Sequence, residues 1–80
     1  METTEDRVKL IFSGQIGTDI DGLDLNGDLV ETYCLDSLDF VETIMELEDE
    51  FDITIPEDEF TGSIKTIHAA IDYIKTRVES

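Results

Sequence analysis

Apolar residues recur at helical spacing in three separate stretches of this 80-residue chain. The first helix is expected to begin at Thr3 or Thr4, since either can cap a helix and Asp6 can complete a capping box with Thr3. Gly17 is the expected stop, because glycine readily ends a helix in a left-handed conformation. Four residues would form the buried face of this helix: Val8, Ile11, Phe12 and Ile16.

The second stretch predicts a helix from about Ser37 to Phe51. Asp36 is a good N-cap residue, and Asp39 adds a negative charge to the first turn, where the helix dipole favours it. The core face follows from four apolar residues that fall within a narrow arc: Phe40, Ile44, Leu47 and Phe51.

Pro56 breaks the chain after this helix, and residues 57–61 can form one short helical turn that carries Phe60. Gly62 and Ser63 are expected to open a last helix that runs from about Lys65 to Arg77. Its buried stripe would consist of Ile64, Ile67, Ile71, Ile74 and Val78.

Residues 18–35 show no clear period and contain the turn signals Gly22 and Asn26-Gly27. The apolar residues of this segment favour a loop that packs onto the rest of the chain. Because no strand alternation of useful length occurs, the pattern predicts an all-α fold, a small four-helix bundle of three main helices and one short helix. Residues 1–80 are expected to form a single domain.

The formal net charge is −16, from 21 acidic and 5 basic residues, and no lysine or arginine occurs between Lys9 and Lys65. This charge disfavours binding to nucleic acids and to anionic membranes, because both need basic residues. Basic protein surfaces are the expected partners. The single cysteine excludes an internal disulfide, and the sequence shows no signal peptide and no apolar run long enough to span a membrane. We therefore expect a soluble cytoplasmic protein that acts as a monomer.

The second helix carries an additional apolar stripe formed by Leu38, Val41 and Met45. Apolar anchors within a charged rim are typical of a surface that binds a partner. Equally, the stripe could cover the edges of the core. Acidic residues near the end of this helix oppose its dipole, so recognition by a basic partner explains them better than local stability does. Those that flank the stripe or lie in the last turn are Glu42, Glu48, Asp49 and Glu50.

Ser37 stands at the start of the same helix, where a serine usually serves as a cap. Here Asp36 already offers a cap, so the Ser37 hydroxyl is free to be an attachment point. A phosphodiester on Ser37 would face the free N–H groups of the helix N-terminus. Asp36 and Asp39 would repel that phosphate, which indicates that the attaching enzyme supplies a metal ion, and these two acids are candidates to help hold it.

The chain resembles the acyl carrier proteins of fatty-acid synthesis over essentially its whole length. The matching residues are Asp36-Ser37-Leu38-Asp39, Val41-Glu42, Met45, Leu47-Glu48, Glu50-Phe51, Ile55-Pro56 and Ala69-Ala70-Ile71-Asp72-Tyr73-Ile74. The resemblance implies a four-helix carrier domain with no catalytic activity. It also implies a 4′-phosphopantetheine arm, derived from coenzyme A and joined to Ser37 by a phosphopantetheinyl transferase, whose thiol holds acyl groups as thioesters.

The same resemblance implies the partners of the second helix. They are synthases, reductases, dehydratases and acyltransferases with basic docking patches. The expected recognition residues are Leu38, Asp39, Val41, Glu42, Met45, Glu48 and Asp49.

Two departures from the family pattern predict a specialised member. Family members commonly carry Leu-Gly where this chain has Tyr33-Cys34, and glycine would give easier access to a positive φ. Phe40 takes a core-facing position that is often smaller, so its ring is expected to shorten or redirect an acyl pocket. Cys34 itself is expected to be a small buried group; a disulfide with the thiol of the arm is the alternative.

Other classes of protein fit the sequence less well. Carriers for polyketide, peptidyl or D-alanyl transfer are the nearest alternative. A calcium-binding module is suggested by Asp24-x-Asn26-x-Asp28, together with Asp19 and Asp21, but Leu29 and Leu35 occupy positions where an EF-hand needs glycine and an acid. A hydrolase is disfavoured because the single histidine, His68, is far from Ser37 in sequence, and no zinc-binding cluster is expected.

Overall fold

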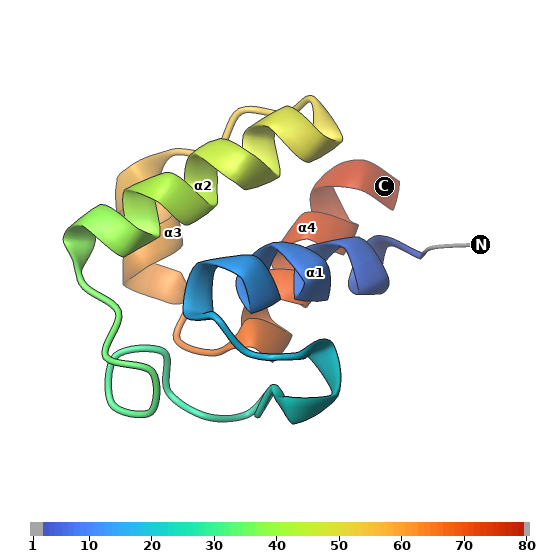
Figure 1. The fold of residues 1–80 in the computed structure, drawn as a ribbon. Coiled ribbons are helices and arrows are strands. Elements are labelled where there is room, and N and C mark those ends of the chain that lie inside the picture. The colour runs from blue at the N-terminus through green and yellow to red at the C-terminus, as the bar shows by residue number, and fades with distance from the viewer. Residues whose placement is uncertain (1–2, 80) are drawn as a thin grey trace.

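A computed structural model describes residues 3–79, and the regular elements of this part of the chain are all helices (Figure 1). The four α-helices are α1 (Thr4–Ile16), α2 (Ser37–Phe51), α3 (Glu57–Ser63) and α4 (Ile67–Glu79). A single 3-10 turn, η1 (Ile20–Gly22), lies in the long connection after α1. The predicted arrangement of three long helices and one short helix is therefore confirmed.

The helix ends follow the expected capping chemistry. At α1, the Asp6 amide donates to the Thr3 hydroxyl at 3.2 Å, and the Thr3 amide donates to the Asp6 carboxylate at 3.3 Å. Gly17 ends this helix at φ 84°, a left-handed conformation that glycine adopts without a steric penalty. The predicted bounds of α2 match the structure at both ends.

The last helix begins later in the chain than predicted. Gly62 and Ser63 extend α3 instead of opening α4, which begins at Ile67 and not at Lys65. The Thr66 hydroxyl accepts a hydrogen bond from the Ala69 amide at 3.0 Å and so caps the new start. Ile64 is buried as predicted but lies outside the helix, whereas Val78 is 40% exposed and does not belong to the buried stripe.

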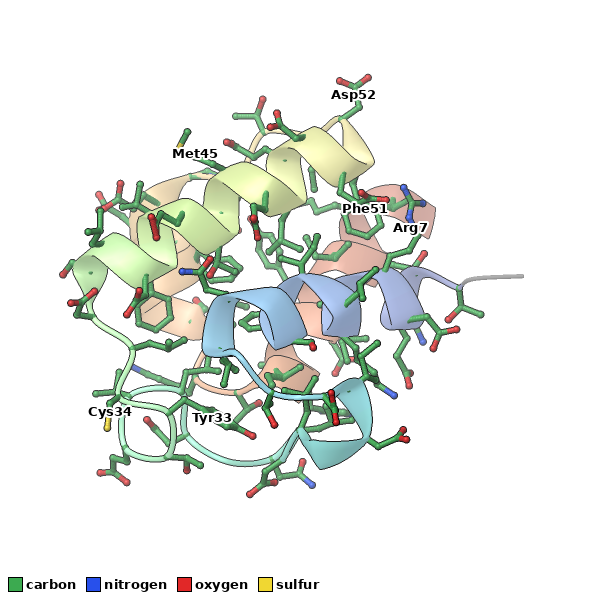
Figure 2. All side chains as sticks on the ribbon, viewed as in Figure 1. Arg7, Tyr33, Cys34, Met45, Phe51 and Asp52 are labelled. Carbon is green, nitrogen blue, oxygen red and sulfur yellow. The ribbon has the colours of Figure 1, made fainter. Side chains whose placement is uncertain are left out.

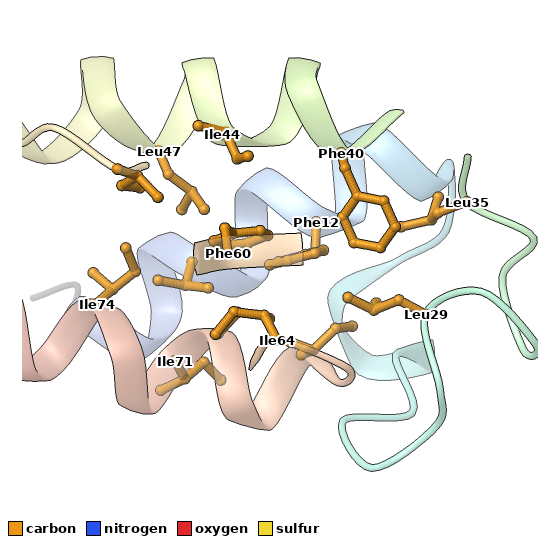
Figure 3. Packing of buried hydrophobic residues seen from close by; sticks show 14 residues of the cluster. Phe12, Leu29, Leu35, Phe40, Ile44, Leu47, Phe60, Ile64, Ile71 and Ile74 are labelled. Atoms are coloured by element: carbon orange, nitrogen blue, oxygen red, sulfur yellow. The ribbon is translucent and has the colours of Figure 1, made fainter. Parts of the chain in front are cut away.

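The core lies where the four helices meet, as Figure 3 shows. α1 packs against both α2 and α4, and α3 closes the remaining side against α2. Three aromatic rings run through this interior in edge-to-face contact, with ring centroids 6.4 Å apart for Phe40 and Phe60 and 6.2 Å apart for Phe60 and Tyr73. The fully buried large apolar side chains are Val8, Phe12, Leu29, Leu47, Phe60, Ile67 and Ile74.

The long loop between η1 and α2 is fastened to the bundle by backbone hydrogen bonds. The Leu29 amide donates to the Lys65 carbonyl at 2.8 Å, and the His68 amide donates to the Leu25 carbonyl at 2.9 Å. Gly27 is confined at its turn, because a Cβ there would lie 2.9 Å from an oxygen of Asp24. The loop thus packs on the domain as predicted, with Leu29 fully buried.

Candidate functional site

Ser37 is the first residue of α2, and its side chain is exposed. The carboxylate of Asp36 caps the helix by accepting the Asp39 amide at 3.0 Å, and Asp39 in turn accepts the Asp36 amide at 3.2 Å. Because this capping box already supplies the cap of α2, the helix does not need the Ser37 hydroxyl as a capping group. The hydroxyl is therefore accessible at the positive end of α2, where a phosphate group is electrostatically favoured.

An open cleft of about 370 Å³ adjoins this serine, and we call it the serine cleft. The loop before α2, the first turn of α2 and the outer side of α3 form its walls. Its lining residues are Val30, Leu35, Asp36, Ser37, Phe40, Glu57 and Thr61. Val30, Glu57 and Thr61 did not emerge from the sequence as site residues, because they belong to other segments and no helical period links them to Ser37.

The outward face of α2 carries a docking ridge, which we define as Leu38, Glu42, Met45 and Asp49. At about 100° per residue these four positions fall within an arc of about 60° directly opposite the core face. Leu38 is 65% exposed and Met45 is 58% exposed, and Figure 2 shows Met45 pointing away from the bundle. Because these two side chains cover no core edge, the interpretation of this stripe as core cover is wrong for them.

The remaining predicted recognition residues lie off this ridge. Asp39 belongs to the capping box and is half-buried, as is Val41. Glu48 accepts a hydrogen bond from the Ile55 amide at 2.8 Å, so it fastens the connection between α2 and α3. This contact accounts for Glu48 without a partner, although its position opposes the helix dipole.

Gln15 is a neighbour of the site that sequence reasoning missed. Its side-chain amide donates to Glu42 at 3.2 Å and to Asp39 at 3.5 Å, and so joins the end of α1 to α2. No motif marks Gln15, because its role depends on how α1 crosses α2. Gln15 orients the Glu42 carboxylate of the docking ridge and leaves its negative charge in place, because the glutamine side chain is neutral.

Positive charge is sparse around the ridge and the serine cleft. Within residues 3–79, four of the five cationic side chains lie within 4.0 Å of a carboxylate group: Arg7, Lys9, Lys75 and Arg77. The exception is Lys65, which lies after α3. The acidic side chains of the ridge therefore form no ion pair in the described part of the molecule and remain available to a basic surface.

Cys34 differs from its expected state, since it is exposed and not buried (Figure 2). Its backbone adopts φ 57°, the left-handed conformation for which glycine is favoured. The positive φ anticipated at this position is thus present, although the residue is cysteine. This turn of the backbone directs the thiol outward, which explains why the expectation of burial was wrong.

The rival readings gain no support from the geometry. In the acidic loop, one oxygen of Asp28 accepts the Val30 and Glu31 amides at 2.8 and 3.0 Å, so it already serves the turn. Across residues 3–79, no group of three or more His, Cys, Asp or Glu side chains is arranged to hold a metal ion. His68 is exposed and its nearest charged neighbour is Asp72, at 3.7 Å.

A small helical bundle that presents an uncommitted serine at a helix N-terminus, beside a cleft and an acidic helix face, has the features of a carrier domain. A family model described as "Phosphopantetheine attachment site" matches residues 6–74. The match covers most of the chain, and the protein therefore belongs to this family, as its resemblance to acyl carrier proteins predicted. It is a phosphopantetheine carrier protein, and its prosthetic group is covalently attached 4′-phosphopantetheine. Domains of this family act as carriers and not as catalysts.

The residues around Ser37 fit this prosthetic group. A phosphodiester there would meet the free N–H groups of α2, and the apolar wall formed by Val30, Leu35 and Phe40 suits a flexible chain with few charges. In the described part of the chain, no helix has the length and apolar character needed to cross a membrane.

Proposed function

We propose that this protein is a free-standing acyl carrier protein of the fatty-acid-synthesis type, with Ser37 as the attachment residue. The proposal rests on the different roles of two neighbouring residues at the start of α2. Asp36 caps the helix, which leaves the adjacent Ser37 hydroxyl exposed beside the serine cleft. When bound, the phosphopantetheine arm supplies a terminal thiol that carries an acyl group as a thioester.

The docking ridge supports the partner part of the proposal. Its alternation of apolar and acidic side chains matches a basic patch that surrounds a shallow apolar depression on a partner enzyme. The expected partners are a phosphopantetheinyl transferase and then synthases, reductases, dehydratases and acyltransferases. Weak, salt-sensitive docking would let a monomeric carrier leave one enzyme and reach the next.

Asp36 and Asp39 have a proposed part in the attachment step. Asp36 accepts the Asp39 amide through one oxygen, and its second oxygen accepts no hydrogen bond from residues 3–79. Asp39 accepts the Asp36 amide through one oxygen, and its second oxygen accepts only the 3.5 Å hydrogen bond from Gln15. These oxygens are candidates to contact a metal ion held by the transferase. Their capping role keeps them in place while the Ser37 hydroxyl reacts.

Carriers for polyketide, peptidyl or D-alanyl transfer remain the second candidate within the same family. The features at Ser37 suit either kind of cargo. The strong acidity of α2 favours the free-standing fatty-acid type, because such a carrier must find separate enzymes by electrostatic attraction.

The proposal is tested by incubating the protein with coenzyme A and a broad-specificity phosphopantetheinyl transferase, followed by intact-mass measurement. The unmodified wild type should gain one phosphopantetheinyl group, and Ser37→Ala should gain none. Because Asp36 provides the cap, Ser37→Ala should change the free energy of unfolding by less than about 0.5 kcal/mol.

Ser63→Ala is the matched control, since Ser63 is also an exposed serine but ends α3. This variant should be modified like the wild type. Modification of Ser37→Ala, or wild type that stays unmodified although it is folded, would contradict the assignment.

A further inference from the structure

The serine cleft has a neighbour, which we call the side cleft. The side cleft has a volume of about 230 Å³ and lies between the loop at residues 28–31 and the end of α3. The two clefts share three lining residues, Val30, Phe40 and Thr61. These residues thus form a partition, and any chain that leaves the serine cleft on this side must pass it.

Phe40 also separates both clefts from the core. Its ring lies between Leu35 and Ile44 at the loop end of the hydrophobic cluster, as Figure 3 shows, and only 8% of the residue is exposed. Its edge-to-face contact with the fully buried Phe60 continues this wall into the bundle. A flexible chain that enters the core from Ser37 past Phe40 must displace this ring and disrupt its packing.

Val30 supports a role for these clefts in holding an apolar chain. It is 55% exposed on the rim of both clefts, although valine side chains are usually buried. An acyl chain in the serine cleft would cover this side chain. The far part of the side cleft is lined by Asp28, Leu29, Glu31, Ile64 and Lys65. Leu29 and Ile64 are buried, so the side chains that present accessible surface there are charged and offer little to additional methylene groups.

We propose that Phe40 limits the cargo to short acyl chains. The inference rests on the proposed attachment of the arm at Ser37. A short chain lies in the serine cleft against Val30, Leu35 and the face of Phe40. The carbons of a longer chain are turned past Thr61 towards the charged end of the side cleft and remain in contact with water.

The test measures how well the protein shields thioesters of increasing length. The unmodified protein is loaded from acyl-coenzyme A substrates by a broad-specificity phosphopantetheinyl transferase, and intact mass follows the cleavage of each thioester by hydroxylamine. For the wild type, protection relative to the matching free acyl-pantetheine should rise over the first few carbons and then stay constant.

The variant Phe40→Leu should open the route into the core. Its protection should continue to rise with chain length, by up to about fourfold for each further methylene that leaves water. Phe51→Leu is the matched control, because Phe51 is a half-buried phenylalanine of the same helix and lines neither cleft. It should show the same constant protection as the wild type.

Chemical shifts give a second readout on the loaded wild type. Short and long chains should both perturb Val30 and Thr61, and neither should perturb Phe60. The wild-type measurements test the inference even if Phe40→Leu does not fold. A wild type whose protection keeps rising with length, or whose Phe60 signals shift, would overturn it, as would a folded Phe40→Leu that behaves like the wild type.

The two proposals fail in different ways. If the wild type cannot be loaded at all, the attachment at Ser37 is wrong and the inference falls with it. If the wild type is loaded but its thioesters react like free acyl-pantetheine at every length, the carrier function stands, and the clefts do not hold the cargo.

Discussion

The end of the molecule where α1 begins and α4 ends, which we call the terminal end, is built differently from the end that holds Ser37. The start of α1 and the ends of α2 and α4 lie on one side of the bundle, and the start of α2 lies on the other (Figure 1). At the terminal end, the Arg7 Nε donates to the Glu50 carboxylate at 2.7 Å. The Arg7 guanidinium also lies over the Phe51 ring, 4.7 Å from its centre (Figure 2). A hydrogen bond from Lys9 lowers the pKa of Glu5.

The serine end has few such contacts. Within the described chain, residues 18–49 take part in no ion pair. The loop before α2 leaves Val30 exposed and holds Cys34 in a left-handed conformation. This contrast indicates that paired charges stabilise the terminal end, while the serine end keeps acidic side chains that form no ion pair and are available to a partner.

The largest expected effect comes from a substitution in the packed core, which the exposed loop at the serine end can be compared with. Phe12 is fully buried on α1 between α2 and α4. Phe12→Ala should lower the free energy of unfolding by about 3–5 kcal/mol, because it removes a large buried ring and leaves a cavity. For a chain of this size that is a large part of the total, which urea denaturation would measure.

Val30→Ala is the comparison at the serine end. It should change the free energy of unfolding by less than about 0.5 kcal/mol, because Val30 is largely exposed. Equal losses at the two positions would show that the loop at the serine end is packed as tightly as the core, against the contrast drawn above.

The second expected effect concerns the docking ridge. Replacing Glu42 by Gln and Asp49 by Asn together should lower kcat/KM of the phosphopantetheinyl transferase by about tenfold at low salt, since two docking charges are lost. The same change should raise the free energy of unfolding by a few tenths of a kcal/mol, because Asp49 opposes the dipole near the end of α2. Both quantities are measured on the same preparation.

The double variant Asp19→Asn and Asp21→Asn is the matched control. It changes the net charge equally but alters exposed residues at η1, away from the ridge. Its kcat/KM should fall much less. An equal fall in both double variants would show that the enzyme responds to total charge and not to the ridge.

The predictable parts of the fold are those whose cause is local. The bounds of α2 follow from the Asp36 cap and the apolar period, and both signals lie within the helix itself. The start of α4 has a local part, the Thr66 cap, and a distant part, because the Leu29 amide donates to the Lys65 carbonyl just before the helix. No local pattern encodes that contact.

The candidate site likewise has one part that local sequence signals predict and another that depends on distant segments. Ser37 and the outward stripe of α2 could be found from the sequence, since they belong to one helix. The position of Glu48 on the helix predicts a contact with a partner, whereas the hydrogen bond that it accepts from the Ile55 amide depends on the turn after α2. The serine cleft required Val30 and Thr61, which only the folded chain brings to Ser37.

The smallest expected effect compares Cys34, at φ 57°, with Asp52, at φ 54°, which are the two non-glycine residues with a positive φ within residues 3–79. A left-handed conformation costs an ordinary residue about 1–2 kcal/mol, and a glycine in the unfolded chain offsets about 0.5–1 kcal/mol of that gain. Cys34→Gly should therefore raise the free energy of unfolding by about 0.5–1 kcal/mol. Thermal and urea denaturation would measure this change.

Asp52 provides the contrast between the two ends. It ends α2, and aspartate tolerates the left-handed conformation better than cysteine does. The gain from Asp52→Asn should thus come from charge alone, at a few tenths of a kcal/mol, and Cys34→Ala should gain nothing because alanine keeps the strain. A loss of stability in Cys34→Gly would mean that unfolded-chain entropy outweighs the strain. In that case the loop before Ser37 would not be the strained element that distinguishes this end of the molecule.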